Sequence, residues 1–289
     1  MPRARAGRLP CVAVLYGAHS FVDLTEGRCH YRIDGPEDGP WVLLVHGATV
    51  PGWQFDRLVP YLAKAGLRTV RADLYGHGYS ARPHTRYVHE LFVRQQVELL
   101  DALGIPGPVH ALGHSLGASI VAQLALQHPA RVARLALSAP LVDFTRRLPV
   151  THVLRAPLLG ELLMWGYVVP LLTRRRMRRY GALENGHYAR LFDGQLRHPG
   201  FHRALLSLFR CGSLGDQRSH YEALRATPHP VLVLRGGDDT VVSRAQTESV
   251  LCALPRARYT EIADAPHSFL LTRPQDVAPA LVPFLTGGP

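Results

Sequence analysis

The sequence predicts an α/β fold: a mostly parallel central sheet of about eight strands, helices on both faces and an inserted α-helical cap. Two observations favour it. Short apolar runs alternate with helical patterns, which is typical of parallel sheets. The alternation stops between residues 141 and 226 and then resumes, which indicates an insertion into one domain. A chain of 289 residues, 47% of them hydrophobic, is long enough to bury such a core.

Local patterns predict the elements before the insertion. Residues 21–24 and 29–33 flank a Glu-Gly pair and are expected to form two strands. After a turn rich in Gly and Pro, the run Trp-Val-Leu-Leu-Val at 41–45 is apolar throughout, as expected for a strand covered on both faces. The remaining strands of this part are expected at 67–72, 109–112 and 135–137. Helices are expected at 53–64, 88–103 and 118–126.

The same alternation predicts the elements after the insertion. Strands are expected at 231–234 and 258–262, and helices near 243–253 and 275–285. In sheets of this kind, ligands bind beyond the carboxyl ends of the strands. Reactive side chains are therefore expected directly after strands.

The pentapeptide Gly-His-Ser-Leu-Gly at 113–117 is the most informative segment of the chain. A serine between a buried strand and a helix, with a glycine two places to either side, is typical of a nucleophile elbow. Side chains at Gly113 and Gly117 would collide with the neighbouring strand and helix. Ser115 itself would adopt strained backbone angles, and the start of the helix would favour negative charge there. Taken alone, the segment also fits an ordinary glycine-bounded turn.

Two further candidates follow strands. Asp239 comes after the strand at 231–234, and His267 comes after the strand at 258–262. A serine hydroxyl needs a base to take its proton, and a histidine can serve as that base. A carboxylate on the other ring nitrogen fixes the tautomer of the histidine. The three residues therefore predict a Ser-His-Asp triad.

With these residues, the chain resembles the α/β-hydrolase superfamily from about residue 21 to about residue 285, because the order Ser, Asp, His is that of these hydrolases. The other matching marks are the His-Gly pair at 46–47 and the segment Asp-Leu-Tyr-Gly-His-Gly-Tyr-Ser at 73–80. The resemblance places the acid three residues after the first glycine of its loop, which selects Asp239. Asp238 remains an alternative, in which case Asp239 would cap the next helix.

The resemblance also implies an oxyanion hole made of the backbone N–H groups of Ala48 and Leu116. His46 is expected mainly to shape the first of these loops, and the segment 73–80 to be a structural turn beside the site. The candidates for contact with the substrate are His46, Trp53, His114 and Trp165.

The predicted domains are a core at 1–140 and 227–289, and a helical cap at 141–226. The apolar stretch 158–172 fits a helix that covers the core, the wall of a tunnel for an acyl chain, or a lip that contacts a membrane. Arg174–Arg179 follows, with five arginines in six residues. It fits a solvated helix end or a site for an anionic partner, either a lipid surface or a phosphorylated carrier. Nucleic acid is not expected, since no aromatic platform accompanies the charge.

Composition adds three expectations. The formal net charge is +11, spread mainly over arginines. The four scattered cysteines are typical of reduced thiols in a cytoplasmic protein. The basic N-terminus precedes an apolar run that is short for a signal peptide, so a secreted or periplasmic location is less expected. No apolar run approaches the roughly 20 residues of a membrane span.

The resemblance implies a serine hydrolase that cleaves an ester-type bond of an apolar acyl substrate through an acyl-enzyme, like a carboxylesterase or lipase. Thioesters, activated amides and carbon–carbon bonds remain open, because the same triad serves them all. Epoxide and haloalkane hydrolases of this fold use an aspartate nucleophile, so Ser115 argues against them. No cofactor or metal is expected. A hypothesis from another class is a catalytically silent member that keeps the pocket to bind a ligand.

Overall fold

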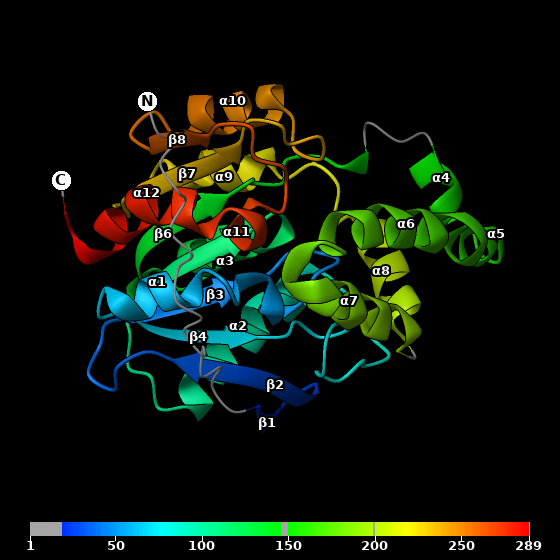
Figure 1. Cartoon of the computed structure of the whole chain (residues 1–289), viewed down its shortest axis with the longest axis horizontal. Helices are drawn as coiled ribbons and strands as arrows, with labels where there is room; N and C mark the ends of the chain where they lie inside the picture. The colour runs from blue at the N-terminus through cyan, green and yellow to red at the C-terminus, as the bar shows by residue number, and fades with distance from the viewer. Residues whose placement is uncertain (1–18, 146–149, 199, 289) are drawn as a thin grey trace, which may run out of the picture.

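The computed structural model describes residues 19–145, 150–198 and 200–288 (Figure 1). An eight-stranded sheet forms its centre, in the order β1-β2-β4-β3-β5-β6-β7-β8. The strands are β1 Ser20–Leu24, β2 Gly27–Asp34, β3 Trp41–Val45, β4 Arg68–Ala72, β5 Val109–His114, β6 Val132–Ser138, β7 Val231–Gly236 and β8 Arg258–Ile262. Strand β2 runs antiparallel to both of its neighbours, and all other neighbouring strands are parallel. The predicted fold class is confirmed.

Helices cover both faces of this sheet because alternate side chains of a strand point in opposite directions. In β3, Val42 and Leu44 join one apolar cluster, while Leu43 and Val45 join the other. The first cluster includes α1 (Val59–Lys64), α11 (Phe269–Thr272) and α12 (Pro274–Thr286). The second includes α2 (His89–Ala102), α3 (Leu116–Gln127), α9 (Arg218–Leu224) and α10 (Arg244–Ala253). The uninterrupted apolar run of β3 follows from this double coverage.

One predicted helix is wrong in its extent. The expected helix at 53–64 is a 3₁₀ turn, η1 (Gly52–Phe55), followed by the shorter α1. Pro60 lies in the first turn of α1. Proline has no N–H to donate, and its ring clashes with the carbonyl four residues earlier, so a helix cannot run through this position unbroken.

Helices fill the stretch between β6 and β7. They are α4 (Val150–Arg155), α5 (Leu159–Leu163), the π-helical turn η4 (Met164–Val168), α6 (Val169–Tyr180), η5 (Leu183–Gly186), α7 (His187–Arg197), α8 (Phe201–Arg210) and α9. Outside this stretch, a short 3₁₀ turn, η2 (Pro129–Arg131), precedes β6. Figure 1 shows α4 to α8 as a group beside the sheet, whereas α9 lies with the core. Of the predicted arginine run Arg174–Arg179, only the side chain of Arg174 is described, and it is exposed. The anionic partner of that run stays a prediction.

The two ends of the helical insertion lie side by side. The Phe144 N–H donates to the Leu214 carbonyl (2.9 Å), and the Gln217 N–H donates to the Val142 carbonyl (2.8 Å). Helix α9, which follows, packs on α3 and α10. We therefore propose a cap from residue 144 to residue 214, narrower than the predicted 141–226.

Candidate active site

Ser115 stands alone between the end of β5 and the start of α3. Its backbone has φ 55° and ψ −116°, a conformation that non-glycine residues rarely adopt. A Cβ atom at Gly113 would lie 2.1 Å from the Gly117 carbonyl oxygen, and one at Gly117 would lie 2.1 Å from the Val45 carbonyl oxygen. Both glycines are therefore required by the close approach of backbone, as the sequence predicts. The strained turn is the geometry of a nucleophile elbow.

Asp239 and His267 form a buried pair at the ends of β7 and β8. The Asp239 Oδ2 atom lies 2.7 Å from Nδ1 of His267. The Asp239 Oδ1 atom accepts from the N–H groups of Val241 (2.7 Å) and Val242 (2.9 Å). Burial alone would raise the pKa of Asp239, but the His267 ring and these two N–H donors outweigh it and lower the pKa. Asp238, by contrast, is exposed and has no part in the pair.

Ser115 reaches the same edge of the sheet. The ring of its neighbour His114 packs on the His267 ring with centroids 4.7 Å apart. Ser115 and His267 are 8% and 5% exposed, so both are nearly buried. Within the described residues, no hydrogen bond joins the Ser115 hydroxyl to the His267 ring. Nucleophile–base hydrogen bonds are often loose before substrate binds, and tighten in the complex.

The loop after β3 lies against the elbow. A Cβ atom at Gly47 would be 3.3 Å from Cβ of Ser115. The N–H of Ala48 belongs to this loop, and the N–H of Leu116 to the first turn of α3, where helices leave donors unpaired. Within the described residues, neither N–H has an acceptor. The structure therefore offers two backbone donors close to one serine.

Two buried histidines fix this loop. His46 donates from Nδ1 to the Gly47 carbonyl (2.7 Å) and accepts at Nε2 from the Leu74 N–H (2.8 Å). Burial lowers the pKa of His46 to about 3, which suits a ring that must accept at one nitrogen. The His77 ring contacts the Ala48 carbonyl through Nε2 (2.8 Å). His46 is fully buried, so it supports the loop and offers no surface to a substrate.

The other pocket candidates lie in three different places. His114 is 3% exposed and sits between Ser138 and the His267 ring. Trp53 packs on the cap residues Tyr180 and Tyr188, with ring centroids 5.8 Å and 5.6 Å away. Trp165 is 64% exposed and lines a hollow of about 620 Å³ whose walls are formed by cap residues. Ser115 is not among the residues that line this hollow.

One residue of the site was missed by sequence reasoning. Gln195, on the cap helix α7, accepts from the Gly78 N–H (2.8 Å) and donates to the Thr49 carbonyl (2.8 Å). It joins the cap to the loop that carries Ala48 and to the turn at 73–80. No motif surrounds Gln195, so the sequence held no signal for this role.

The described residues contain neither a candidate metal site nor a candidate membrane span. Within residues 19–145, 150–198 and 200–288, no group of three or more His, Cys, Asp and Glu side chains could hold a metal ion. The same part of the chain contains no helix that is both long and apolar enough to span a bilayer.

Comparison with known proteins agrees with this fold. The model of the alpha/beta hydrolase fold family matches residues 40–274, and the chain belongs to that family. A 2-hydroxymuconate semialdehyde hydrolase from a Pseudomonas species is 34% identical over 214 residues, which are 70% of this chain and 71% of that protein. A 2-hydroxy-6-oxo-2,4-heptadienoate hydrolase from Pseudomonas putida is 30% identical over 212 residues, 70% of this chain and 72% of that protein. A crystal structure of a hydrolase from Pseudomonas aeruginosa is 26% identical, with a TM-score of 0.74, and the match covers 93% of this chain and 98% of that one.

Proposed function

We propose that this α/β hydrolase is a serine hydrolase in which Ser115 is the nucleophile, His267 the base and Asp239 the residue that orients His267. The observation that carries the proposal is the strained elbow of Ser115 at the sheet edge where the Asp239–His267 hydrogen bond is already formed. A binding protein with no chemistry would have no need to hold a serine at φ 55° beside such a pair.

The proposed reaction begins when His267 takes the proton of the Ser115 hydroxyl. The Ser115 oxygen bonds to the acyl carbon, and the carbonyl electron pair moves to its oxygen, where the Ala48 and Leu116 N–H groups stabilise the charge. When that pair returns, the leaving group departs with the proton from His267. Water then releases the acid by the same steps, and the serine regains its proton. Asp239 keeps its negative charge throughout and stabilises the charged His267 ring.

The substrate that we propose is an ester with an apolar acyl group. A second candidate is a carbon–carbon bond next to a ketone, and it is favoured by the names of the two Pseudomonas relatives above. In that reaction the leaving group is a stabilised carbanion, which takes the proton from His267. The triad serves both reactions, so the acyl pocket and the cap decide between them. A cytoplasmic location also stays a prediction.

A fluorophosphonate probe tests the nucleophile. Labelling of the wild-type protein that disappears in Ser115→Ala, with both proteins folded, is the expected result. Absence of labelling in folded wild-type protein would instead indicate the catalytically silent ligand binder.

Kinetics then identify the substrate class. The panel consists of p-nitrophenyl esters of increasing acyl length, acyl thioesters and a diketone acid with a cleavable carbon–carbon bond. The highest kcat/KM is expected for the esters. A preference for the diketone acid would replace the ester assignment while leaving Ser115 as the nucleophile.

A further inference from the structure

Apolar side chains gather on the outer surface of the cap. Nine large apolar side chains are exposed among the described residues, and six of them fall between residues 153 and 167. Leu158 is 80% exposed, Leu162 70% and Trp165 64%. We call this group the cap patch, and its members are Val153, Leu158, Leu159, Leu162, Trp165 and Tyr167. Soluble proteins rarely expose so many apolar groups together unless something binds there.

The segment that carries the patch is firmly attached to the cap. A Cβ atom at Gly160 would lie 2.4 Å from the Leu154 carbonyl oxygen, so α5 packs directly against α4. Arg210 on α8 donates to the Leu154 and Ala156 carbonyls (both 3.0 Å). It also binds both carboxylate oxygens of Glu161, at 2.7 Å and 2.9 Å. The exposed leucines are thus held outward on an ordered support.

The segment that carries the patch is rich in arginine. Residues 144–180 contain eight arginines and one acidic residue, Glu161. Arg210 neutralises that single acid. The side chains of Arg155 and Arg174 are exposed, and Arg197 and Arg203 line the hollow beside Trp165. Arg197 is paired with Asp193 (2.8 Å), whereas Arg155 and Arg174 have no acidic partner among the described residues. The segment therefore combines exposed apolar side chains with exposed arginines.

A second copy of the chain fits this surface poorly. A two-fold contact would place the same patch against itself, and so would bring the arginine-rich rims of two copies together. Like charges in an interface oppose association. An anionic bilayer instead accepts leucine and tryptophan side chains at the boundary of headgroups and acyl chains, and its phosphates attract arginine. Figure 1 shows α5 at the end of the molecule opposite α12, where a flat surface can reach it.

We propose that the cap patch docks the protein on anionic phospholipid membranes, with Leu158, Leu162 and Trp165 inserted at the headgroup boundary. The protein would bind peripherally and reversibly. The inference does not depend on the chemistry of Ser115, because it concerns the outer face of the cap.

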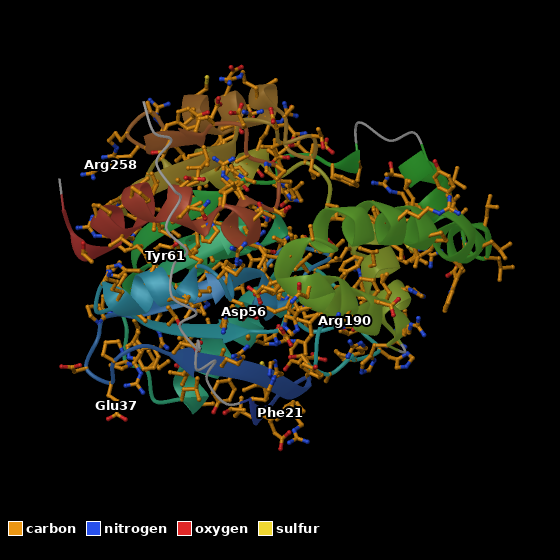
Figure 2. All side chains as sticks on the ribbon, in the orientation of Figure 1. Phe21, Glu37, Asp56, Tyr61, Arg190 and Arg258 are labelled. Carbon is orange, nitrogen blue, oxygen red and sulfur yellow. The ribbon has the colours of Figure 1, made fainter. Side chains whose placement is uncertain are left out.

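Co-sedimentation with vesicles tests the proposal on the full-length chain. The vesicles consist of phosphatidylcholine alone or of phosphatidylcholine mixed with phosphatidylserine. Binding is expected for the mixed vesicles and is expected to weaken as NaCl rises. The double variant Leu158→Gln, Leu162→Gln should reduce the partition coefficient by about tenfold or more, because each leucine loses apolar burial. The matched control is Phe21→Gln, which removes an exposed ring on β1, away from α5, and should bind like the wild type (Figure 2).

A second measurement needs no leucine substitution. Brominated phosphatidylcholine in the mixed vesicles should quench tryptophan fluorescence of the wild-type protein, and Trp165→Phe should abolish most of that quenching. Three outcomes overturn the proposal: no binding to mixed vesicles at low salt, equal binding to both vesicle types, or undiminished binding by the double variant. If the wild-type protein binds no vesicles but sediments as a dimer, and the double variant sediments as a monomer, the patch would be assigned to self-association instead.

Discussion

Asp238 and Asp239 are neighbours in the chain but have opposite surroundings. Asp239 is 6% exposed and uses one carboxylate oxygen for His267 and the other for two backbone N–H groups. Asp238 is exposed. The tight turn after β7 points the first carboxylate outward and the second inward, which is why only one of them can orient a histidine.

Asparagine substitutions at these two positions should therefore have very different effects. Asp239→Asn should lower kcat by about 10⁴, because the neutral amide favours the wrong tautomer of His267 and no longer stabilises its charged form. Asp238→Asn should stay near the wild type. Steady-state kinetics on the best ester of the panel measures both. Loss of activity in Asp238→Asn alone would contradict the proposed triad.

A single methyl group tests the elbow. In Gly117→Ala, the new Cβ atom would lie 2.1 Å from the backbone oxygen of Val45, which cannot rotate away. The free energy of unfolding should fall by about 2 kcal/mol or more. Gly194→Ala on α7 is the matched control, since nothing lies within 4 Å of its added Cβ. It should raise stability by about 0.5 to 1 kcal/mol, because alanine favours helix. Urea unfolding that shows equal stability for both variants would contradict the steric argument.

At the scale of elements, the sequence predicted best where one local pattern decides the structure. The apolar run of β3 and the glycine spacing around Ser115 are each a short pattern of consecutive residues, so both could be predicted from the sequence, although the atoms they contact lie far along the chain. The helix expected at 53–64 was too long because its apolar spacing hid the effect of Pro60. The role of Gln195 could not be predicted, since its partners Thr49 and Gly78 lie far away in the chain.

Gln195 connects the cap helix α7 to the loop after β3, and the proposed chemistry requires that this loop keep its position. Gln195 is 5% exposed and bridges α7 of the cap to the loop of Ala48. Gln195→Ala removes both hydrogen bonds and should lower kcat by about tenfold, because the Ala48 N–H, the proposed oxyanion donor, is less well placed. Gln127→Ala, at the exposed end of α3, is the control and should leave kcat unchanged. A change in KM alone for Gln195→Ala would indicate that the residue shapes only the pocket.

At the scale of the whole molecule, buried histidines couple stability to pH. Burial lowers the pKa of both His46 and His89 to about 3. In the unfolded chain, histidine titrates near 6.5, so below that pH the unfolded state binds more protons than the native state. The stability due to these neutral rings is fully present above pH 6.5, roughly, and is lost as pH falls toward about 3.

His89→Gln tests this coupling. Each such histidine contributes a slope of about 1.4 kcal/mol per pH unit to the free energy of unfolding in that window. In urea unfolding below about pH 5.5, where the unfolded histidine is mostly protonated, the slope should be smaller by about one proton in His89→Gln than in the wild type. Equal slopes would mean that His89 can take up a proton in the folded protein.

The hydrogen bonds Phe144–Leu214 and Val142–Gln217, which join the two ends of the insertion, bear on how the lid of this fold can vary between proteins. Because the inserted segment begins and ends at neighbouring positions, its length and sequence can change without altering the pairing of the strands. Exchange of the segment between these two hydrogen-bonded ends would replace the lid without moving Ser115 or His267. The substrate preference can thus change with the lid, provided that the new lid also replaces the two contacts that Gln195 makes with the core.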